Sequence, residues 1–148
     1  MEPDLRSTAR IGSHPIHPML VPFPIAFFVA ALVTDITYWR TETLMWSHFS
    51  SWLIAAGIGT GLLAAVAGLT DFIARRAVRA QAPAWPHAIG NLVALGLAIL
   101  NAFIHARDGW TAVVPWGLVL SATVVAILAF TGWMGWSMVY RYRVGVAA

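Results

Sequence analysis

The sequence predicts an all-α protein, an integral membrane bundle of four helices with both termini on the cytoplasmic side. Of the 148 residues, 59% are apolar and only 10% are charged, whereas a soluble domain usually has about a quarter charged residues. Four apolar stretches are long enough to cross a bilayer, which takes about 20 helical residues. Arginines gather on one side of these stretches, as they do in short cytoplasmic loops. These three observations exclude an ordinary water-soluble enzyme.

The four stretches make up a single membrane domain over residues 1–148. We expect the spans near residues 19–39, 51–73, 88–106 and 112–135. The first span starts among Pro18, Pro22 and Pro24, and proline is tolerated there because the first N–H groups of a helix have no partner within it. Its start is therefore predicted to be extended or kinked. Residues 47–50 are expected to form a polar loop before the second span.

The arginines predict the orientation of the bundle. With four spans, the termini and the segment between spans two and three share one face. That face carries seven arginines: Arg6, Arg10, Arg75, Arg76, Arg79, Arg141 and Arg143. The opposite face has only Arg40 and Arg107, so the arginine-rich face is predicted to be cytoplasmic. No basic stripe is left for a nucleic-acid partner, and the expected partner is the lipid bilayer.

Span three has a polar face that is predicted to point into the bundle. His87 and His105 are about five helical turns apart, so they share one azimuth at a separation of about 27 Å along the axis. Asn91 and Asn101 lie within about 40° of the same line. Small residues follow the same side at i+4 spacing: Gly90, Ala94, Ala98, Ala102 and Ala106. Such residues let membrane helices approach closely, so this face is expected to contact another span.

Polar groups from the first half of the chain reach the same end as His87. The run His14-Pro15-Ile16-His17-Pro18 leads into span one, and Asp71 lies near the end of span two. Ionisable groups at membrane depth are costly, and they normally face the interior or pair with one another. We therefore expect His14, His17, Asp71 and His87 to converge near the cytoplasmic surface.

The predicted cluster suits a redox cofactor. The chain has no cysteine, which excludes thiolate-bound zinc, iron–sulfur clusters and covalently attached haem, so a cofactor must rely on His, Asp or Glu. We predict a b-type haem with His17 and His87 as its ligands, because imidazole is a common haem ligand and bundles hold cofactors between facing helices. Asp71 and His14 would support the pair, and Asn91 and His105 are further cofactor-binding candidates on the same helix face.

Two alternatives use the same residues. A single metal ion bound by His14, His17, Asp71 and His87 is one of them. In the other, these side chains only cap helices and hydrogen-bond one another, an interpretation that we favour for His48, which would otherwise pair with His105 near the opposite surface. No metalloprotease, nucleophile-elbow, P-loop or dinucleotide motif occurs in the sequence, and whether the protein is an enzyme stays open.

The two ends of the chain resemble a known family. The residues that carry the resemblance are the run from His14 to Val21 with Phe23-Pro24, and Gly132-Trp133-Met134-Gly135 with Val139-Tyr140-Arg141 and Gly145-Val146. They are similar to motifs of the domain-of-unknown-function 2231 family of predicted bacterial membrane proteins. The resemblance implies a multi-pass, four-helix protein of the bacterial inner membrane with an uncharacterised function. Some relatives carry a Rieske-type iron–sulfur domain, which implies electron transfer.

The chain departs from the family pattern near its end. Trp136 stands where a second glycine is common, and Tyr142-Arg143 stands where a His-Gly pair is common. Any role of that histidine in the relatives is therefore not carried over to this chain.

The sequence thus favours a membrane electron-transfer protein with a His-ligated haem b or metal ion. A quinone or a redox partner protein is the expected electron partner, although no residue specifies it. The alternative is a non-catalytic membrane subunit or a small-solute carrier, whose polar face would contact a partner or a substrate. The glycines of span two would pack equally well on a second copy of the chain, so a homo-oligomer is left open.

Overall fold

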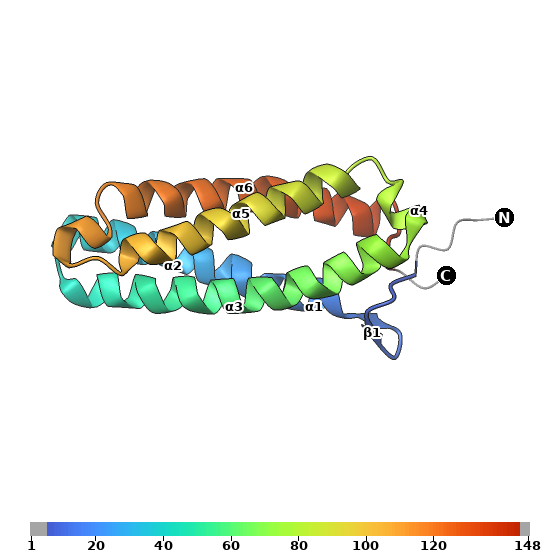
Figure 1. Ribbon diagram of the computed structural model, residues 1–148, viewed down its shortest axis with the longest axis horizontal. Helices are drawn as coiled ribbons and strands as arrows, with labels where there is room; N and C mark the ends of the chain where they lie inside the picture. The colour runs from blue at the N-terminus through green and yellow to red at the C-terminus, as the bar shows by residue number, and fades with distance from the viewer. Residues whose placement is uncertain (1–5, 146–148) are drawn as a thin grey trace.

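The computed structural model describes residues 6–145, which form a bundle of four long helices (Figure 1). The elements in chain order are β1 (Arg10–Ile11), β2 (His14–Pro15), α1 (Ile16–Leu20), α2 (Pro22–Thr41), α3 (Leu44–Ala74), α4 (Arg76–Arg79), α5 (Ala84–His105), the 3-10 helix η1 (Gly109–Ala112) and α6 (Trp116–Tyr140). The segments that contain α2, α3, α5 and α6 are long and apolar enough to cross a membrane. The predicted all-α membrane fold is confirmed. Residues 1–5 and 146–148, among them Val146 of the family motif, lie outside the described residues.

The long helices pack as two hairpins that close into a ring. Helix α2 packs along α3 and α5 packs along α6, while α3 also contacts α5 and α2 also contacts α6. The first and last described residues, Arg6 and Gly145, lie at the same end of the bundle as α4 (Figure 1). We call this the arginine-rich end and the opposite one the far end. The assignment of the arginine-rich end to the cytoplasm stays a prediction.

Small and polar side chains fill the interior, and large apolar side chains face outward. Ala94 and Ala98 of the predicted stripe are buried, whereas Leu92 and Phe103 on the other side of α5 are each 71% exposed. Lipid is as apolar as these side chains, so membrane helices associate through close backbone approach rather than by burying large residues. Gly57 illustrates the principle, because a Cβ atom there would lie 2.7 Å from the Phe28 ring of α2.

Two of the expected boundaries change. The segment at residues 47–50 was predicted to be a loop, and this prediction is wrong, since α3 already begins at Leu44. The physical reason is that both serines of the segment lie inside the bundle: Ser47 and Ser50 are buried, and the Ser50 hydroxyl forms a 2.7 Å hydrogen bond with Thr34 of α2. The predicted irregular start of span one takes the form of the extended β2 followed by the short α1, which only Val21 separates from α2.

Candidate functional site

His17 and His87 meet at the arginine-rich end, and we call them the paired histidines. His17 comes from α1 and His87 from the first turn of α5, and both side chains are half-buried. Their ring centroids lie 6.1 Å apart, with the ring planes nearly perpendicular at 87°. The predicted convergence of these two residues, 70 positions apart in the chain, therefore occurs in the structure.

Each paired histidine is oriented by a backbone carbonyl of a neighbouring helix. Nδ1 of His17 donates to the carbonyl of Ala64 in α3 at 2.7 Å, and Nδ1 of His87 donates to the carbonyl of Thr131 in α6 at 2.9 Å. A carbonyl oxygen can only accept a hydrogen bond, so both Nδ1 atoms carry the proton. In the neutral imidazole, the lone pair of each ring is then on Nε2.

The Nε2 atoms have no strong protein partner. Within residues 6–145, no hydrogen bond to Nε2 of His17 is found. The amide nitrogen of Asn91 lies 3.4 Å from both ring nitrogens of His87, so this amide lies across the ring rather than in line with one lone pair. Asn91 is itself held by Thr131, whose hydroxyl donates to its side-chain oxygen at 3.2 Å. The predicted candidate Asn91 thus lies beside the paired histidines.

Two glycines make room for the two rings. A Cβ atom on Gly68 of α3 would lie 2.8 Å from Nδ1 of His17, and one on Gly135 of α6 would lie 3.0 Å from Cε1 of His87. A contact of 2.8 Å is not sustained by real side chains, so alanine at Gly68 would displace the His17 ring, and alanine at Gly135 would push the His87 ring by a few tenths of an ångström. Gly135 belongs to one of the two terminal motifs and His17 to the other, and the structure brings these motifs to the same place.

Asp71 and His14 do not join the paired histidines. The Asp71 carboxylate accepts hydrogen bonds from the hydroxyl of Ser7 at 2.5 Å and from the backbone N–H groups of Thr8 and Ala9 at 2.5 and 2.9 Å. His14 is exposed on β2, with its ring 3.5 Å from the Ser13 hydroxyl. Among the described residues, no group of three or more His, Asp or Glu side chains is placed to hold a metal ion.

Asp71 nevertheless supports His17 indirectly. It fixes residues 7–9, and the carbonyl of Ala9 accepts the backbone N–H of Ile16 at 2.9 Å, one residue before His17. The role of Ser7 was missed by the sequence analysis. A serine in a polar N-terminal segment carries no periodic signal, so the sequence offered no means of finding it.

A second polar cluster lies at the far end, and we call its four members the buried network: Asp35, Asn101, His105 and Ser121. Asp35 is fully buried in α2, and one of its oxygens lies 2.9 Å from Nε2 of His105 in α5. Its other oxygen accepts the hydroxyl of Ser121 in α6 at 2.5 Å, and Ser121 accepts the Asn101 amide at 2.8 Å. The network therefore ties three helices together.

Both ring nitrogens of His105 are engaged. Nδ1 faces the backbone carbonyl of Asn101 at 3.1 Å, while Nε2 faces the Asp35 carboxyl. Each contact needs a proton, so the pair holds two protons and is neutral overall, either as imidazolium with carboxylate or as imidazole with carboxylic acid. Neutrality makes its burial at membrane depth tolerable. His105 is thus not free to bind a cofactor, and His48 is exposed on α3 and is not brought to it.

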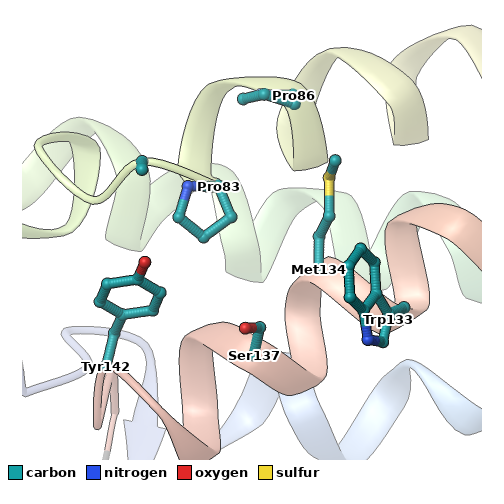
Figure 2. A pocket seen from close by; sticks show the side chains of 7 residues that line it. Pro83, Pro86, Trp133, Met134, Ser137 and Tyr142 are labelled. Atoms are coloured by element: carbon teal, nitrogen blue, oxygen red, sulfur yellow. The ribbon is translucent and has the colours of Figure 1, made fainter.

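A shallow groove adjoins the paired histidines between α5 and α6 (Figure 2). Its volume is about 240 Å³, and its lining comprises Ala82, Pro83, Pro86, Trp133, Met134, Ser137 and Tyr142. The backbone N–H of His87 donates to the carbonyl of Pro83 at 3.0 Å. Met134 directly precedes Gly135, which lies against the His87 ring. The groove and His87 therefore share two segments of the chain.

The comparisons with known proteins agree with the membrane character of the chain. A family model described as "Predicted membrane protein (DUF2231)" matches residues 13–148. No curated protein and no solved structure matches the chain.

Proposed function

The chain belongs to the DUF2231 family of predicted membrane proteins, and from this premise we propose that it is a membrane electron-transfer protein that binds b-type haem, or a single metal ion, through His17 and His87. The observation that carries the proposal is the state of the two rings. Both donate Nδ1–H to a backbone carbonyl, and among residues 6–145 the one protein contact at either Nε2 is the Asn91 amide, 3.4 Å from that of His87. Metal-bound histidines almost always have their other nitrogen held in this way, because it sets the tautomer and the ring orientation.

The separation of the rings supports the same conclusion. Two imidazoles bound to one metal ion at about 2.0–2.1 Å have centroids about 5–6.5 Å apart, depending on the angle at the metal. The observed 6.1 Å lies in this range. His17 of α1 and His87 of α5 are therefore already at a suitable separation to bind one metal ion.

The number of ligands favours haem over a bare metal ion. A structural zinc ion usually takes four protein ligands, whereas the porphyrin supplies four nitrogens to haem iron and leaves two positions for the protein. The paired histidines supply two. Asp71, by fixing the segment before His17, and Asn91, by lying across His87, are positioning residues in this proposal.

Absorption spectroscopy of the detergent-purified chain, together with elemental analysis for iron, copper and zinc, tests the proposal. We expect a Soret band in the wild type that is lost in His17→Ala and in His87→Ala. His48→Ala is the matched control, because His48 is an exposed histidine on α3, and it should keep the band. Size-exclusion chromatography shows whether each variant is still folded.

The possible outcomes separate the alternatives. Metal without a Soret band, lost in His17→Ala and in His87→Ala, would favour a single metal ion over haem. A featureless spectrum with background metal content in the folded wild type would overturn the proposal. A non-catalytic subunit or small-solute carrier would then be the better interpretation, and changed copurification or transport in the same variants would support it.

A further inference from the structure

The lining of the groove between α5 and α6 limits the kind of ligand that it can bind. We propose that it binds the headgroup of a lipid-soluble quinone, which exchanges electrons with the cofactor of the paired histidines. The electron exchange rests on the proposed function, whereas the binding of the quinone can be tested without it.

The position of the groove points to an occupant from the bilayer. It lies where the start of α5 meets the end of α6, and both segments are long and apolar enough to span the membrane. Trp133 in its wall is 66% exposed on the outside of the bundle, where lipid surrounds α6. A ligand can therefore enter sideways from the membrane, as a quinone with an isoprenoid tail would. Its volume of about 240 Å³ is below the roughly 300 Å³ of the smallest drug-sized pockets, which suits one substituted ring with the tail left in lipid.

The lining matches a flat, uncharged ring with oxygen atoms at its edge. Pro83 and Pro86 on the α5 side and Trp133 on α6 offer apolar surfaces (Figure 2). The Ser137 hydroxyl lies on α6 like Trp133, and the Tyr142 hydroxyl points toward the Pro83 side of the groove. Within residues 6–145 neither hydroxyl has a hydrogen-bond partner in the protein, so both can donate to quinone carbonyl oxygens. None of the seven lining residues is charged, which disfavours the phosphate of a lipid headgroup.

The groove also lies close enough to the paired histidines for electron transfer. Pro83 accepts the backbone N–H of His87, and Met134 adjoins Gly135 against the His87 ring. Oxidation of one hydroquinone to the quinone releases two electrons and two protons. A haem iron held by the paired histidines would take these electrons one at a time, two irons for each hydroquinone, and the protons would pass to water at the membrane surface. The Ser137 and Tyr142 hydroxyls would accept hydrogen bonds from the two O–H groups of the hydroquinone before these groups lose their protons.

Photolabelling tests the binding. An azido-benzoquinone with a short alkyl tail is bound to the purified wild type, irradiated, and located by mass spectrometry of peptides. We expect labelling within residues 82–86 or 133–142 that excess unmodified quinone suppresses. Trp133→Ala should weaken binding roughly tenfold through the loss of one aromatic contact, and the combined Ser137→Ala and Tyr142→Phe variant should weaken it further.

The control variants distinguish this inference from the proposed function. Trp136→Ala removes another exposed tryptophan of α6 that does not line the groove, and it should leave labelling unchanged. His87→Ala should abolish the Soret band but keep the labelling. Specific labelling of a protein that holds neither haem nor metal would support the groove and overturn the proposed function.

Three results would overturn the inference. One is labelling that excess quinone does not suppress, and another is labelling spread evenly over the four spans. The third is displacement of the azido-benzoquinone by phospholipid in preference to quinone, which would assign the groove to a lipid headgroup. In a haem-loaded protein, a short-chain hydroquinone should also reduce the iron roughly tenfold more slowly in Trp133→Ala than in Trp136→Ala.

Discussion

The two ends of the bundle use histidine in opposite ways. At the arginine-rich end, His17 and His87 each donate one hydrogen bond from Nδ1 to a backbone carbonyl, and Nε2 has no strong protein partner. At the far end, His105 has an acceptor at both nitrogens, because Asp35 comes from α2 to meet it. The same residue type on the same face of α5 therefore has two roles, as a proposed ligand at one end and as a fully hydrogen-bonded interior group at the other. The partner of the second nitrogen decides between these roles.

The largest expected effect comes from removing the acid of the buried network. Asp35→Ala leaves His105 buried without its counterpart, and breaking a buried pair in this way costs about 3–5 kcal/mol. We expect a marked loss of folded protein in a denaturant or SDS titration in mild detergent. Asp108→Ala, which removes an exposed acid, is the control and should change the midpoint little. Equal stability of the two variants would contradict the comparison.

Replacing each of the two histidines of α5 by alanine in turn tests the division of roles directly. His87→Ala should remove the cofactor absorbance and change the unfolding midpoint little, since its ring is half-buried. His105→Ala should lower the midpoint and keep the absorbance per folded molecule. Absorbance spectra and SDS titrations of both variants check this. If His105→Ala also lost the absorbance, the far end would have to be counted as part of the cofactor site.

The glycines beside the paired histidines should matter for the cofactor more than for the fold. Gly135→Ala places a methyl group 3.0 Å from the His87 ring, and overpacking of this kind costs about 1–3 kcal/mol. We expect lower cofactor content per folded molecule, measured from absorbance and protein concentration. Gly132→Ala on the same helix is the control, because nothing lies within 4 Å of its Cβ position. Similar cofactor content in both variants would argue against a role of the ring position.

The smallest expected effect concerns the hydroxyl of Thr131. Thr131→Val keeps the shape of the side chain and the carbonyl that His87 uses, and it removes the hydrogen bond to Asn91 together with a longer one to the carbonyl of Leu128. The loss should be about 0.5–1.5 kcal/mol in an SDS titration, with an unchanged absorption spectrum. A spectral shift would show that Asn91 acts on the His87 ring more strongly than its position across the ring indicates.

The fold could be predicted almost completely from hydropathy. Bilayer thickness dictates span length, and the four expected spans correspond to the four long helices. The meeting of His17 and His87 was also predictable, because both stand where a span begins at the same membrane surface. Their distance and hydrogen bonds were not, since these depend on the rotation of α3 and α6, which present Ala64 and Thr131 to the rings.

The other polar residues show where sequence reasoning stops. Asp71 was expected to face the histidines, but its carboxylate accepts hydrogen bonds from the backbone N–H groups of Thr8 and Ala9. The segment that contains these two residues is irregular, so no sequence periodicity predicts such contacts. Asp35 stands at the same predicted depth as His105, but the sequence does not give the rotation of α2 that turns its carboxyl toward the ring. Ser121 is likewise one of three hydroxyl residues in an apolar span, and the sequence does not show which of them meets a polar partner on another helix.

The origin of the groups around the paired histidines constrains how the protein is made. His17 belongs to the first span, its carbonyl partner Ala64 to the second, His87 to the third and Thr131 to the fourth. During synthesis, the last of these groups enters the membrane only when α6 does. A chain truncated before α6 would keep both histidines but could orient only one of them. The proposed cofactor would therefore find both rings in place only after all four spans have been inserted.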